Sequence, residues 1–364
     1  QEQDIFNSLQ QNFAAEYEAV FYDRMAAKTI VVIPSLTLDP LILSKVEGVV
    51  HYEERLLCLL LLLRMPRTHV VYVTSQPIDP VLIEYYLHLL PGITGHHARQ
   101  RLHFFTCYDA SHVSLTQKIL ERPRLISKIK NAIPPGHLAH LACFNVTEHE
   151  RKLATVLQLP VYGCDPGLLF WGTKSGSREI FKACGIDTPA GYENLQDEND
   201  IIKALADLYT NNPGIKKAVI KMNDGFSGEG NAVFSFKNII AGDDIAAQIQ
   251  LQLPLQIKIV ASDLGYEQFI KKFTGMGGIV EAFIDGQQKA TPSVQCRINP
   301  LGKIDIISTH DQLMGGQDDQ VFLGGTFPAA AEYSVEVGII ARQIAIALKS
   351  KGVLGRFGID FLSV

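Results

Sequence analysis

The sequence predicts a two-part protein of the α/β and α+β classes, in which a parallel sheet with helices comes first and mixed strands and helices follow. Two observations lead to this prediction. In the first part, short β-branched runs alternate with stretches of helical spacing, which is typical of a parallel sheet covered on both faces. Near Asp165-Pro-Gly167 glycine clusters become frequent and this alternation ends. We therefore expect one domain over residues 1–165 and another over 166–364.

The composition is that of a globular protein with room for buried cores. The chain has 364 residues, of which 47% are hydrophobic, so disordered, collagen-like and coiled-coil classes are excluded. The net charge of −5 argues against a general nucleic-acid binder. The longest apolar run, 56–63, is shorter than the roughly 20 residues of a membrane-spanning helix, and we expect a buried helix there. Residues 1–13 lack a secretory signal, so we expect a cytoplasmic protein that binds neither nucleic acid nor membrane.

Cysteine and histidine spacing argues against a zinc site. The six cysteines are scattered through mostly apolar segments without a C-x-x-C pair, which predicts reduced, buried thiols. No H-x-x-x-H or H-E-x-x-H spacing occurs, and we expect His310 to be a structural histidine with satisfied hydrogen bonds.

The first part of the chain contains five strand signals and four helix signals in alternation. Any ligand of such a sheet is expected at the carboxyl ends of its strands. The segment after the first strand, 34–39, has no G-x-G-x-x-G, so a dinucleotide site is poorly supported and this domain binds a substrate or holds a partner domain. The expected strands are 28–33, 69–74, 102–106, 137–144 and 160–163, and the expected helices are about 39–64, 80–90, 114–131 and 148–157, the last capped by Thr147.

A glycine-rich hairpin spans residues 218–236. Two β-branched or aromatic runs flank a loop with Gly225, Gly228 and Gly230. Glycines let backbone amides converge on an anion, and Lys221 on the entering strand could place an ammonium beside a phosphate. An ordinary hairpin with a glycine-rich turn is the alternative.

A short helix is expected between Thr173 and Gly185, with Lys174 and Arg178 four residues apart on one face. Two like charges on one face repel unless an anion lies between them. The alternatives are therefore an anion site and a solvated basic face.

Two carboxylates interrupt apolar strands in the second part. Glu281 lies in the segment 277–286, where a buried strand rarely carries a carboxylate without a partner. If that strand lines a cleft, Glu281 is suited to accept a hydrogen bond from a base or a ribose. Asp360 follows the expected helix 335–350, and a divalent cation is the first explanation for it, with pairing to Arg356 as the alternative.

A second hairpin is expected from 292–298 and 304–312. It carries or adjoins a group of polar side chains, which are Arg297, His310, Asp311 and Gln312.

The order of these segments resembles the ATP-grasp superfamily of carboxylate–amine ligases over about residues 165–364. Three motifs carry a closer resemblance to the amino-acid and peptide ligase branch, which has an N-terminal pre-ATP-grasp domain. They are Gly278-Ile-Val-Glu281, Ser308-Thr-His-Asp-Gln312 and Gly355-Arg-Phe-Gly-Ile-Asp360. The resemblance implies a Rossmann-like first domain and an ATP-grasp second domain with a mobile lid over about 190–275.

The resemblance also implies roles for individual residues and a reaction. ATP and Mg²⁺ would be used to convert a carboxylate into an acyl phosphate, which an amine then attacks to form an amide or peptide bond. The implied assignments are Lys174 and Lys221 for the ATP phosphates, Ser227, Gly228 and Gly230 for the closing loop, Glu281 and the backbone near Ile284 for adenine, Asp360 for magnesium, and Arg297 with Lys221 for catalysis.

One feature departs from the family pattern. A Glu-x-Asn with a second metal carboxylate is expected on the strand after Asp360, and none follows before Val364. Either the sequence is a piece of a longer chain or the metal site is degenerate, and we expect the first because Asp360 and both lysines are intact. The alternatives to a ligase are a non-catalytic ATP-binding regulatory or scaffold module and a phosphotransferase. The acid, the amine and the oligomeric state are not predicted.

Overall fold

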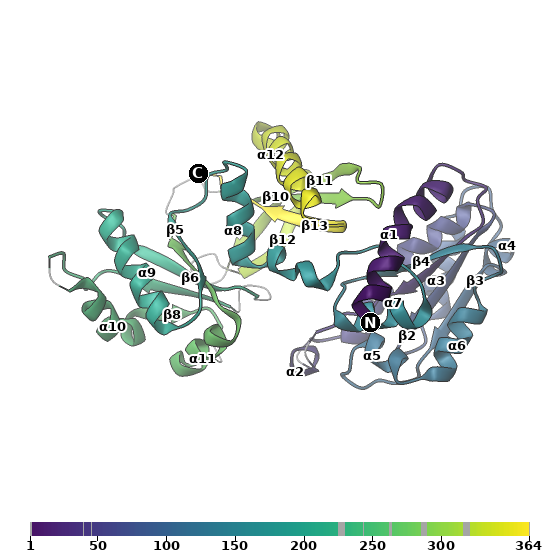
Figure 1. Ribbon diagram of the computed structural model, residues 1–364, viewed down its shortest axis with the longest axis horizontal. Helices are drawn as coiled ribbons and strands as arrows, with labels where there is room; N and C mark the ends of the chain where they lie inside the picture. Colours follow the sequence, from purple (N-terminus) through teal and green to yellow (C-terminus); the bar gives the residue numbers. More distant parts are fainter. Residues whose placement is uncertain are drawn as a thin grey trace. The chain divides into compact units, whose positions relative to one another are not determined.

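The computed structural model describes residues 2–38, 40–44, 46–224, 230–242, 244–261, 264–284, 290–315 and 321–363 (Figure 1). The chain divides into two compact units by its contacts. The N-terminal unit comprises Gln1–Pro166 with the short segments Ile298–Lys303 and Gly352–Arg356, and the C-terminal unit comprises Gly167–Arg297, Ile304–Lys351 and Phe357–Val364. This division differs from the boundary expected near residue 165 mainly in those two short segments.

The sheet of the N-terminal unit has four parallel strands in the order β3-β2-β1-β4. Ile30 lies opposite Val70 on one side and His140 on the other. The predicted parallel sheet is therefore confirmed. The expected fifth strand is wrong, because in 160–163 only Val161 forms an isolated bridge, with Leu141. The strands are β1 Lys28–Ile33, β2 Thr68–Thr74, β3 Leu102–Thr106 and β4 Leu138–Cys143.

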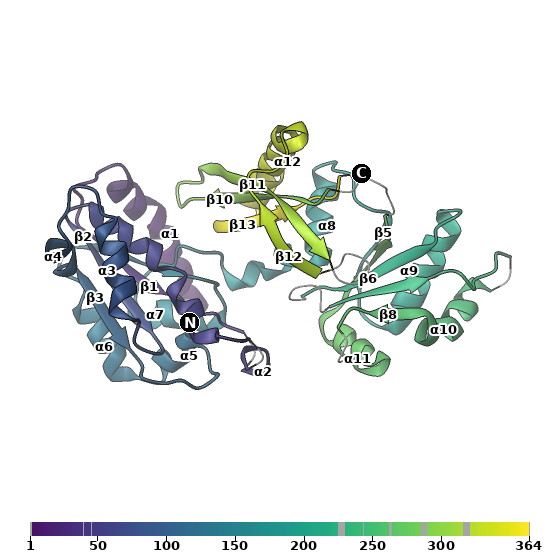
Figure 2. The same ribbon diagram turned by 180° about the vertical axis from the view of Figure 1, so that it is seen from behind.

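Helices cover both faces of this sheet (Figure 1, Figure 2). Alternate residues of β1 enter two separate cores, with Val31 and Ile33 in one and Ile30 and Val32 in the other. The first core also receives side chains from α1 Glu2–Phe21, α5 Leu115–Leu120, α6 Pro123–Asn131 and α7 Glu148–Leu157, and the second from the 3₁₀ helix η2 Leu57–Arg64, α3 Pro80–His88 and α4 Gly95–Arg99.

The long helix expected over 39–64 is wrong. The structure has the short helix α2 Pro40–Leu43 and the 3₁₀ helices η1 Val49–Glu54 and η2. Leu57, Leu60 and Leu63 are buried, and this spacing of three residues matches the 3.0 residues per turn of a 3₁₀ helix. A leucine run does not distinguish a 3₁₀ helix from an α-helix, because both periods place several leucines inward.

The helix expected over 114–131 is interrupted. It forms α5 and α6, and the second begins at Pro123 after Arg122. Proline lacks the amide hydrogen that would continue the first helix and suits the first position of a new one. The helix 148–157 is confirmed, with Thr147 and Glu150 forming a capping box.

The first sheet of the C-terminal unit has five strands in the order β5-β9-β6-β7-β8, and its described pairs are antiparallel. One core joins a face of this sheet to three helices. These elements span most of the range for which a mobile lid is expected, and its closure stays a prediction. The elements are β5 Gly191–Leu195, α9 Glu198–Asn211, β6 Lys217–Met222, β7 Asn231–Ser235, α10 Ile245–Gln256, β8 Ile257–Ile259, α11 Tyr266–Met276 and β9 Gly278–Ala282.

The second sheet of this unit has the strand order β12-β11-β10-β13, and the expected hairpin 292–312 is confirmed as β10 and β11. A long helix, α12, follows β12. The elements are β10 Pro292–Ile298, β11 Ile304–Gly315, β12 Val321–Thr326, α12 Ala331–Ser350 and β13 Gly355–Asp360.

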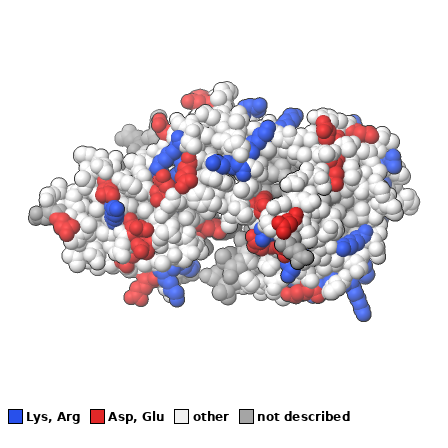
Figure 3. All heavy atoms as spheres, in the orientation of Figure 1, with Lys and Arg blue, Asp and Glu red and all other residues white. Residues whose placement is uncertain are grey.

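Three further features concern the surface charge, the helices and the cysteines. Acidic and basic side chains are interspersed on the face seen in Figure 3. Within the described part of the chain, no helix is both long and apolar enough to cross a bilayer. All six cysteines are free, as expected, but only Cys107 and Cys296 are buried, and Cys58 is exposed.

Candidate functional site

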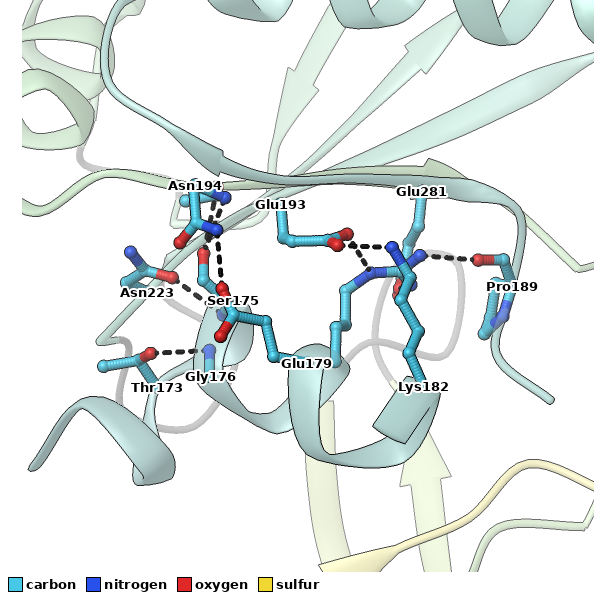
Figure 4. Close-up of polar contacts among 12 residues, drawn as sticks. Thr173, Ser175, Gly176, Glu179, Lys182, Pro189, Glu193, Asn194, Asn223 and Glu281 are labelled. Carbon is cyan, nitrogen blue, oxygen red and sulfur yellow. Dashed lines mark hydrogen bonds and ion pairs between the residues drawn. The ribbon is translucent and has the colours of Figure 1, made fainter. Parts of the chain in front are cut away.

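Helix α8, Lys174–Ala183, begins beside the end of strand β6. Thr173 caps the helix by accepting a hydrogen bond from the Gly176 amide at 3.1 Å. The Lys174 amide donates to the Asn223 carbonyl at 3.2 Å, and the Ser175 amide donates to the Asn223 side-chain oxygen at 3.0 Å. Asn223 lies two residues after Lys221, so these bonds bring the segments that carry both predicted phosphate lysines together (Figure 4).

Gly176 allows this first turn of α8 to lie directly on the preceding chain. A Cβ atom at position 176 would lie 2.0 Å from the Phe170 carbonyl oxygen. Gly278 has the same role in the sheet, since its Cβ would lie 2.3 Å from the Lys221 carbonyl oxygen. Both glycines therefore permit close backbone approaches around the segments that carry the lysines.

Lys221 and Glu281 lie on the face of the five-stranded sheet that is opposite its core. Val219 pairs with Glu281 and Lys221 with Ile279, whereas the intervening Ile220 and Val280 point into the core. The Lys221 Nζ lies 2.5 Å from the Glu281 Oε1. The expectation that a buried Glu281 needs a partner is met by this ion pair.

Arg178 is the second partner of Glu281. Its guanidinium donates from Nη1 to the Glu281 Oε2 at 2.9 Å, from Nη2 to the Pro189 carbonyl at 2.9 Å, and from Nε to a Glu193 oxygen at 3.3 Å. Only 4% of Arg178 is exposed. Of the two alternatives for this helix face, the solvated one is wrong for Arg178, because its side chain is buried. The anions beside Arg178 are carboxylates of the protein, and a bound anion near Lys174 stays a prediction. Two anions on neighbouring strands explain why this cation is tolerated inside.

Glu193 extends the network toward solvent. It pairs with Lys182 from the last turn of α8, and Figure 4 shows Lys182 and Glu193 directed toward each other. Burial acts to raise the pKa of Glu193, but hydrogen bonds from Lys182 and Arg178 prevail and lower it. Glu179 lies on another side of α8 and accepts from the Asn194 amide group at 2.8 Å.

Charged side chains of both signs act on Lys174. Surrounding protein atoms and then the positive charge of Lys221 lower its pKa, and the carboxylates of Asp360, Glu281 and Asp224 act in the opposite direction. Water still reaches Lys174, so solvent screening reduces these effects. Lys221, Glu281 and Asp360 nevertheless lie near enough to Lys174 for their charges to act on it.

Asp360 and Arg297 lie on the same face of the second sheet. Along β13, Gly358 and Asp360 are exposed while Ile359 is buried. A Cβ at Gly358 would lie 2.9 Å from the Gln295 amide nitrogen, so Gln295 and, two residues on, Arg297 share the exposed face. The Arg297 Nη2 lies 2.7 Å from an Asp305 oxygen.

The alternative pairing of Asp360 with Arg356 is wrong. The two residues are separated by four strand positions, or about 13 Å, and the described residues contain no ion pair between them. Within the described part of the chain, no group of three or more His, Cys, Asp or Glu side chains is arranged to hold a metal.

Of the remaining predicted site residues, two lie among the residues that the structure describes and two lie outside them. Gly230 is buried immediately before β7, and its carbonyl accepts from the Met222 amide at 3.0 Å. Ile284 follows β9, and its backbone groups have no hydrogen-bond partner within the described chain. Ser227 and Gly228 lie outside the described residues.

The hairpin residues His310 and Asp311 have structural contacts. Asp311 accepts from the Ala330 amide at 2.9 Å and from the Tyr333 hydroxyl at 2.6 Å, which fixes the start of α12. His310 stacks on Phe327 with 4.7 Å between ring centroids. The expectation of a fully satisfied histidine is wrong, because the His310 Nδ1 is buried without a partner among the described residues.

Comparison with known proteins gives the family. Residues 168–259 and 260–364, together more than half of the chain, match the family described as IQCH-like, ATP-grasp. The chain belongs to this family. Within the ATP-grasp fold, α8, the β6–β7 hairpin and β9 are the elements that carry the two lysines and Glu281.

Two curated relatives and one solved structure extend this result. The chain is 26% identical over 88% of its length to L-propargylglycine–L-glutamate ligase from Streptantibioticus cattleyicolor, and 21% identical over 98% of its length to IQ motif-containing protein H from Danio rerio. It spans 65% and 37% of those two proteins. A biotin carboxylase from Campylobacter jejuni shares the fold, with a TM-score of 0.54, 14% identity, and coverage of 93% of this chain and 62% of that one.

Sequence reasoning missed the partners of Arg178 and the role of Asn223. Glu193 lies in no pattern that marks a site, and Asn223 lies in the glycine-rich hairpin, where the pattern points to the glycines and Lys221. The available signal for Arg178 was the pair of apolar residues, Ile180 and Phe181, that follow it on a short helix, since these predict that one face of the helix is buried.

Proposed function

We propose that this chain binds ATP through Lys174, Lys221 and the glycine-rich β6–β7 hairpin. The observation that carries the proposal is the pair of hydrogen bonds from the first turn of α8 to Asn223, which holds two lysine-bearing segments together. Two ammonium groups held close repel each other, and a polyphosphate relieves this repulsion. Glu281 and the backbone of Ile284, which has no hydrogen-bond partner among the described residues, are suited to hold the edge of adenine.

We further propose that the protein containing this chain is a ligase. It would join a carboxylate to an amine through an acyl phosphate. Membership in the ATP-grasp family and similarity to a protein named as a ligase of two amino acids support this. The substrates we propose are therefore ATP, an amino acid or peptide with a free carboxylate, and an amine. Such a reaction draws on cytoplasmic ATP, so a cytoplasmic location is part of the same proposal.

Magnesium fits the residues present. Asp360 offers a hard, exposed carboxylate on the same sheet face as Arg297 and acts electrostatically on Lys174. Mg²⁺ is usually held by one or two carboxylates together with substrate phosphates, so Asp360 would hold it here. When bound, Mg²⁺ neutralises phosphate charge.

The side chains contribute by position and charge. A carboxylate is a poor acyl donor, and transfer of a phosphoryl group to it requires charge neutralisation and alignment more than covalent work by the protein. Lys174 and Lys221 would hold the phosphates, and Arg297 would stabilise the group in transfer. Closure of the loop with Ser227, Gly228 and Gly230 would exclude water from the acyl phosphate.

The test is Lys221→Ala, with Lys216→Ala as the matched control. Loss of the Lys221 ammonium removes a charge from the transferred phosphate, so ADP release with pooled amino acids should fall by about 10²-fold or more. Lys216 is exposed beside the same strand, and its variant should retain activity. Circular dichroism should be unchanged in both.

Binding is tested separately by thermal unfolding with ATP and Mg²⁺. Ligand at 100 times its Kd stabilises by about 2.7 kcal/mol through linkage. If saturating nucleotide leaves the melting temperature unchanged, or Lys221→Ala turns over normally, the proposed site is wrong.

A non-catalytic ATP-binding module is the second candidate. The similarity to IQ motif-containing protein H over 98% of this chain is compatible with this candidate as well as with a ligase. Nucleotide binding without ADP release for any pool of acid and amine would support this candidate. A phosphotransferase would instead release ADP with an acceptor alone and yield a stable phosphate ester.

A further inference from the structure

Five side chains of alternating charge form a continuous line from solvent to the proposed phosphate site. We call this line the charge ladder, and each member contacts the next through an ion pair. Its outer end is about half exposed, its three middle members are mostly or fully buried, and its inner end faces the site. The members, from outside inward, are Lys182, Glu193, Arg178, Glu281 and Lys221.

Arg178 is the centre of the charge ladder. Each of its three nitrogen atoms donates to a different acceptor: the carboxylates of Glu193 and Glu281 and the carbonyl of Pro189. These acceptors lie on β5, on β9 and on the segment before β5. The planar guanidinium thereby fixes three backbone segments relative to α8, which a flexible ammonium does not do.

Glu281 transmits this arrangement to Lys221. Its two oxygens are divided between the two cations, Oε2 to Arg178 at 2.9 Å and Oε1 to Lys221 at 2.5 Å. Only 8% of Glu281 is exposed, so its carboxylate has little room to turn. The position of the Lys221 ammonium, at the end of a flexible four-carbon stem, is set by the orientation of this carboxylate.

We propose that Arg178 is a positioning residue for nucleotide binding, which contacts no nucleotide itself and acts through Glu281 on Lys221. The proposal rests on the proposed ATP site. Arg178 and Glu281 are 103 residues apart, and α8 lies on the face of β9 that bears Glu281 because Ser175 and Arg178 both bond to β9.

A purely structural role makes a different prediction. If Arg178 only ties α8 to the sheet, its loss weakens nucleotide binding by the same factor whether or not Lys221 is present. If it acts through Lys221, its loss has no further effect once the Lys221 ammonium is gone. A double-mutant cycle separates the two.

The experiment measures the Kd of MgADP by calorimetry for the wild type, Arg178→Gln, Lys221→Ala and the double variant, each below its unfolding temperature. Arg178→Gln should weaken binding about tenfold or more in the otherwise wild-type chain, by analogy with the roughly 10–100-fold that loss of an orienting partner costs a metal site. In the Lys221→Ala background the same change should alter Kd by less than about twofold.

Arg151→Gln is the matched control. Arg151 is also a mostly buried arginine on a helix, α7, with Glu148 and Asp165 as carboxylate partners. Its loss should lower the melting temperature and leave Kd unchanged. Arg178→Lys keeps the charge but cannot form the three-way fork, so it should bind more weakly than the wild type and more tightly than Arg178→Gln.

Three outcomes overturn the proposal. Wild-type Kd in Arg178→Gln refutes it while leaving the ATP site intact, and equal factors in both backgrounds assign Arg178 a structural role. A wild type that binds no MgADP refutes the ATP site and this inference with it. If Arg178→Gln does not fold, the cycle is completed with Arg178→Lys, for which a wild-type Kd is the refuting result.

Discussion

Residue 176 is a glycine because a carbonyl group occupies the space of any side chain. The Phe170 oxygen lies 2.0 Å from where its Cβ would be, and the Trp171 Cα lies 3.0 Å away. Both neighbours are backbone atoms, which cannot rotate aside as the end of a side chain can. The close backbone approach that glycine permits at position 176 therefore sets where α8 begins, and with it the position of Lys174.

Gly176→Ala should destabilise the C-terminal unit by about 2–3 kcal/mol, because overpacking forces the backbone to shift. The measurement is urea unfolding followed by fluorescence of Trp171, the one tryptophan of the chain. Gly338→Ala in α12 is the control, since nothing lies within 4 Å of its Cβ position. There the higher helix propensity of alanine should add up to about 1 kcal/mol, and equal losses in both variants would contradict this account.

At the scale of single elements, η2 shows how a leucine run acquires its geometry. Leu57, Leu60 and Leu63 enter the core beneath β1 and β2, and the leucines between them are only partly buried. Three residues per turn place every third side chain inward, so the 3₁₀ geometry concentrates burial on three positions.

Leu60→Ala should lower the free energy of unfolding by about 2–5 kcal/mol, the usual cost of a cavity in a core. Leu89→Ala is the control, because Leu89 is 48% exposed. Denaturant unfolding monitored by far-ultraviolet circular dichroism gives both values. Similar small losses at both positions would show that η2 is not part of the core.

At the scale of the whole molecule, the histidines are concentrated in one unit. The chain has 11, and all except His310 belong to the N-terminal unit. Burial first, and then the neighbouring His137, His103 and Arg101, lower the pKa of His69 to about 4. Burial and Lys28 lower the pKa of His140 to about 4, and aromatic rings of Phe13 and Tyr162 surround it.

Acidification from pH 7 to pH 5 should therefore destabilise the N-terminal unit before the C-terminal one. Between pH 6.5 and 4 the unfolded state binds protons that the folded His69 and His140 do not, so the free energy of unfolding falls as the pH falls. Each group contributes less than about 1.4 kcal/mol per pH unit, since both rings keep some contact with solvent. Burial raises the pKa of Glu53, which opposes this trend near its own titration.

The two units can be followed separately because Trp171 lies in the C-terminal one. Circular dichroism should show a transition that shifts with pH more than the fluorescence transition does. His69→Gln should reduce that shift, and the contribution of Glu53 is common to both proteins. Equal shifts of both transitions, with no difference in the variant, would contradict the assignment.

Local sequence determined most strands and marked several candidate site residues. The β-branched run 28–33 forms β1 because such side chains suit a pleated, buried surface. Lys221 and Glu281 were recognisable for local reasons as well: a charge beside a glycine-rich turn, and a carboxylate in an apolar strand. Family membership was predictable from the order of these signals.

Tertiary structure alone decided which charges meet. The sequence left open an anion site or a solvated basic face for Arg178, and strand register and the placement of α8 give it the carboxylates of Glu193 and Glu281. The sequence specifies each charged residue and its neighbours along the chain. The free energy of a buried charge depends on partners as far as 103 residues away, so only the packed fold determines whether that charge binds a ligand or positions another residue.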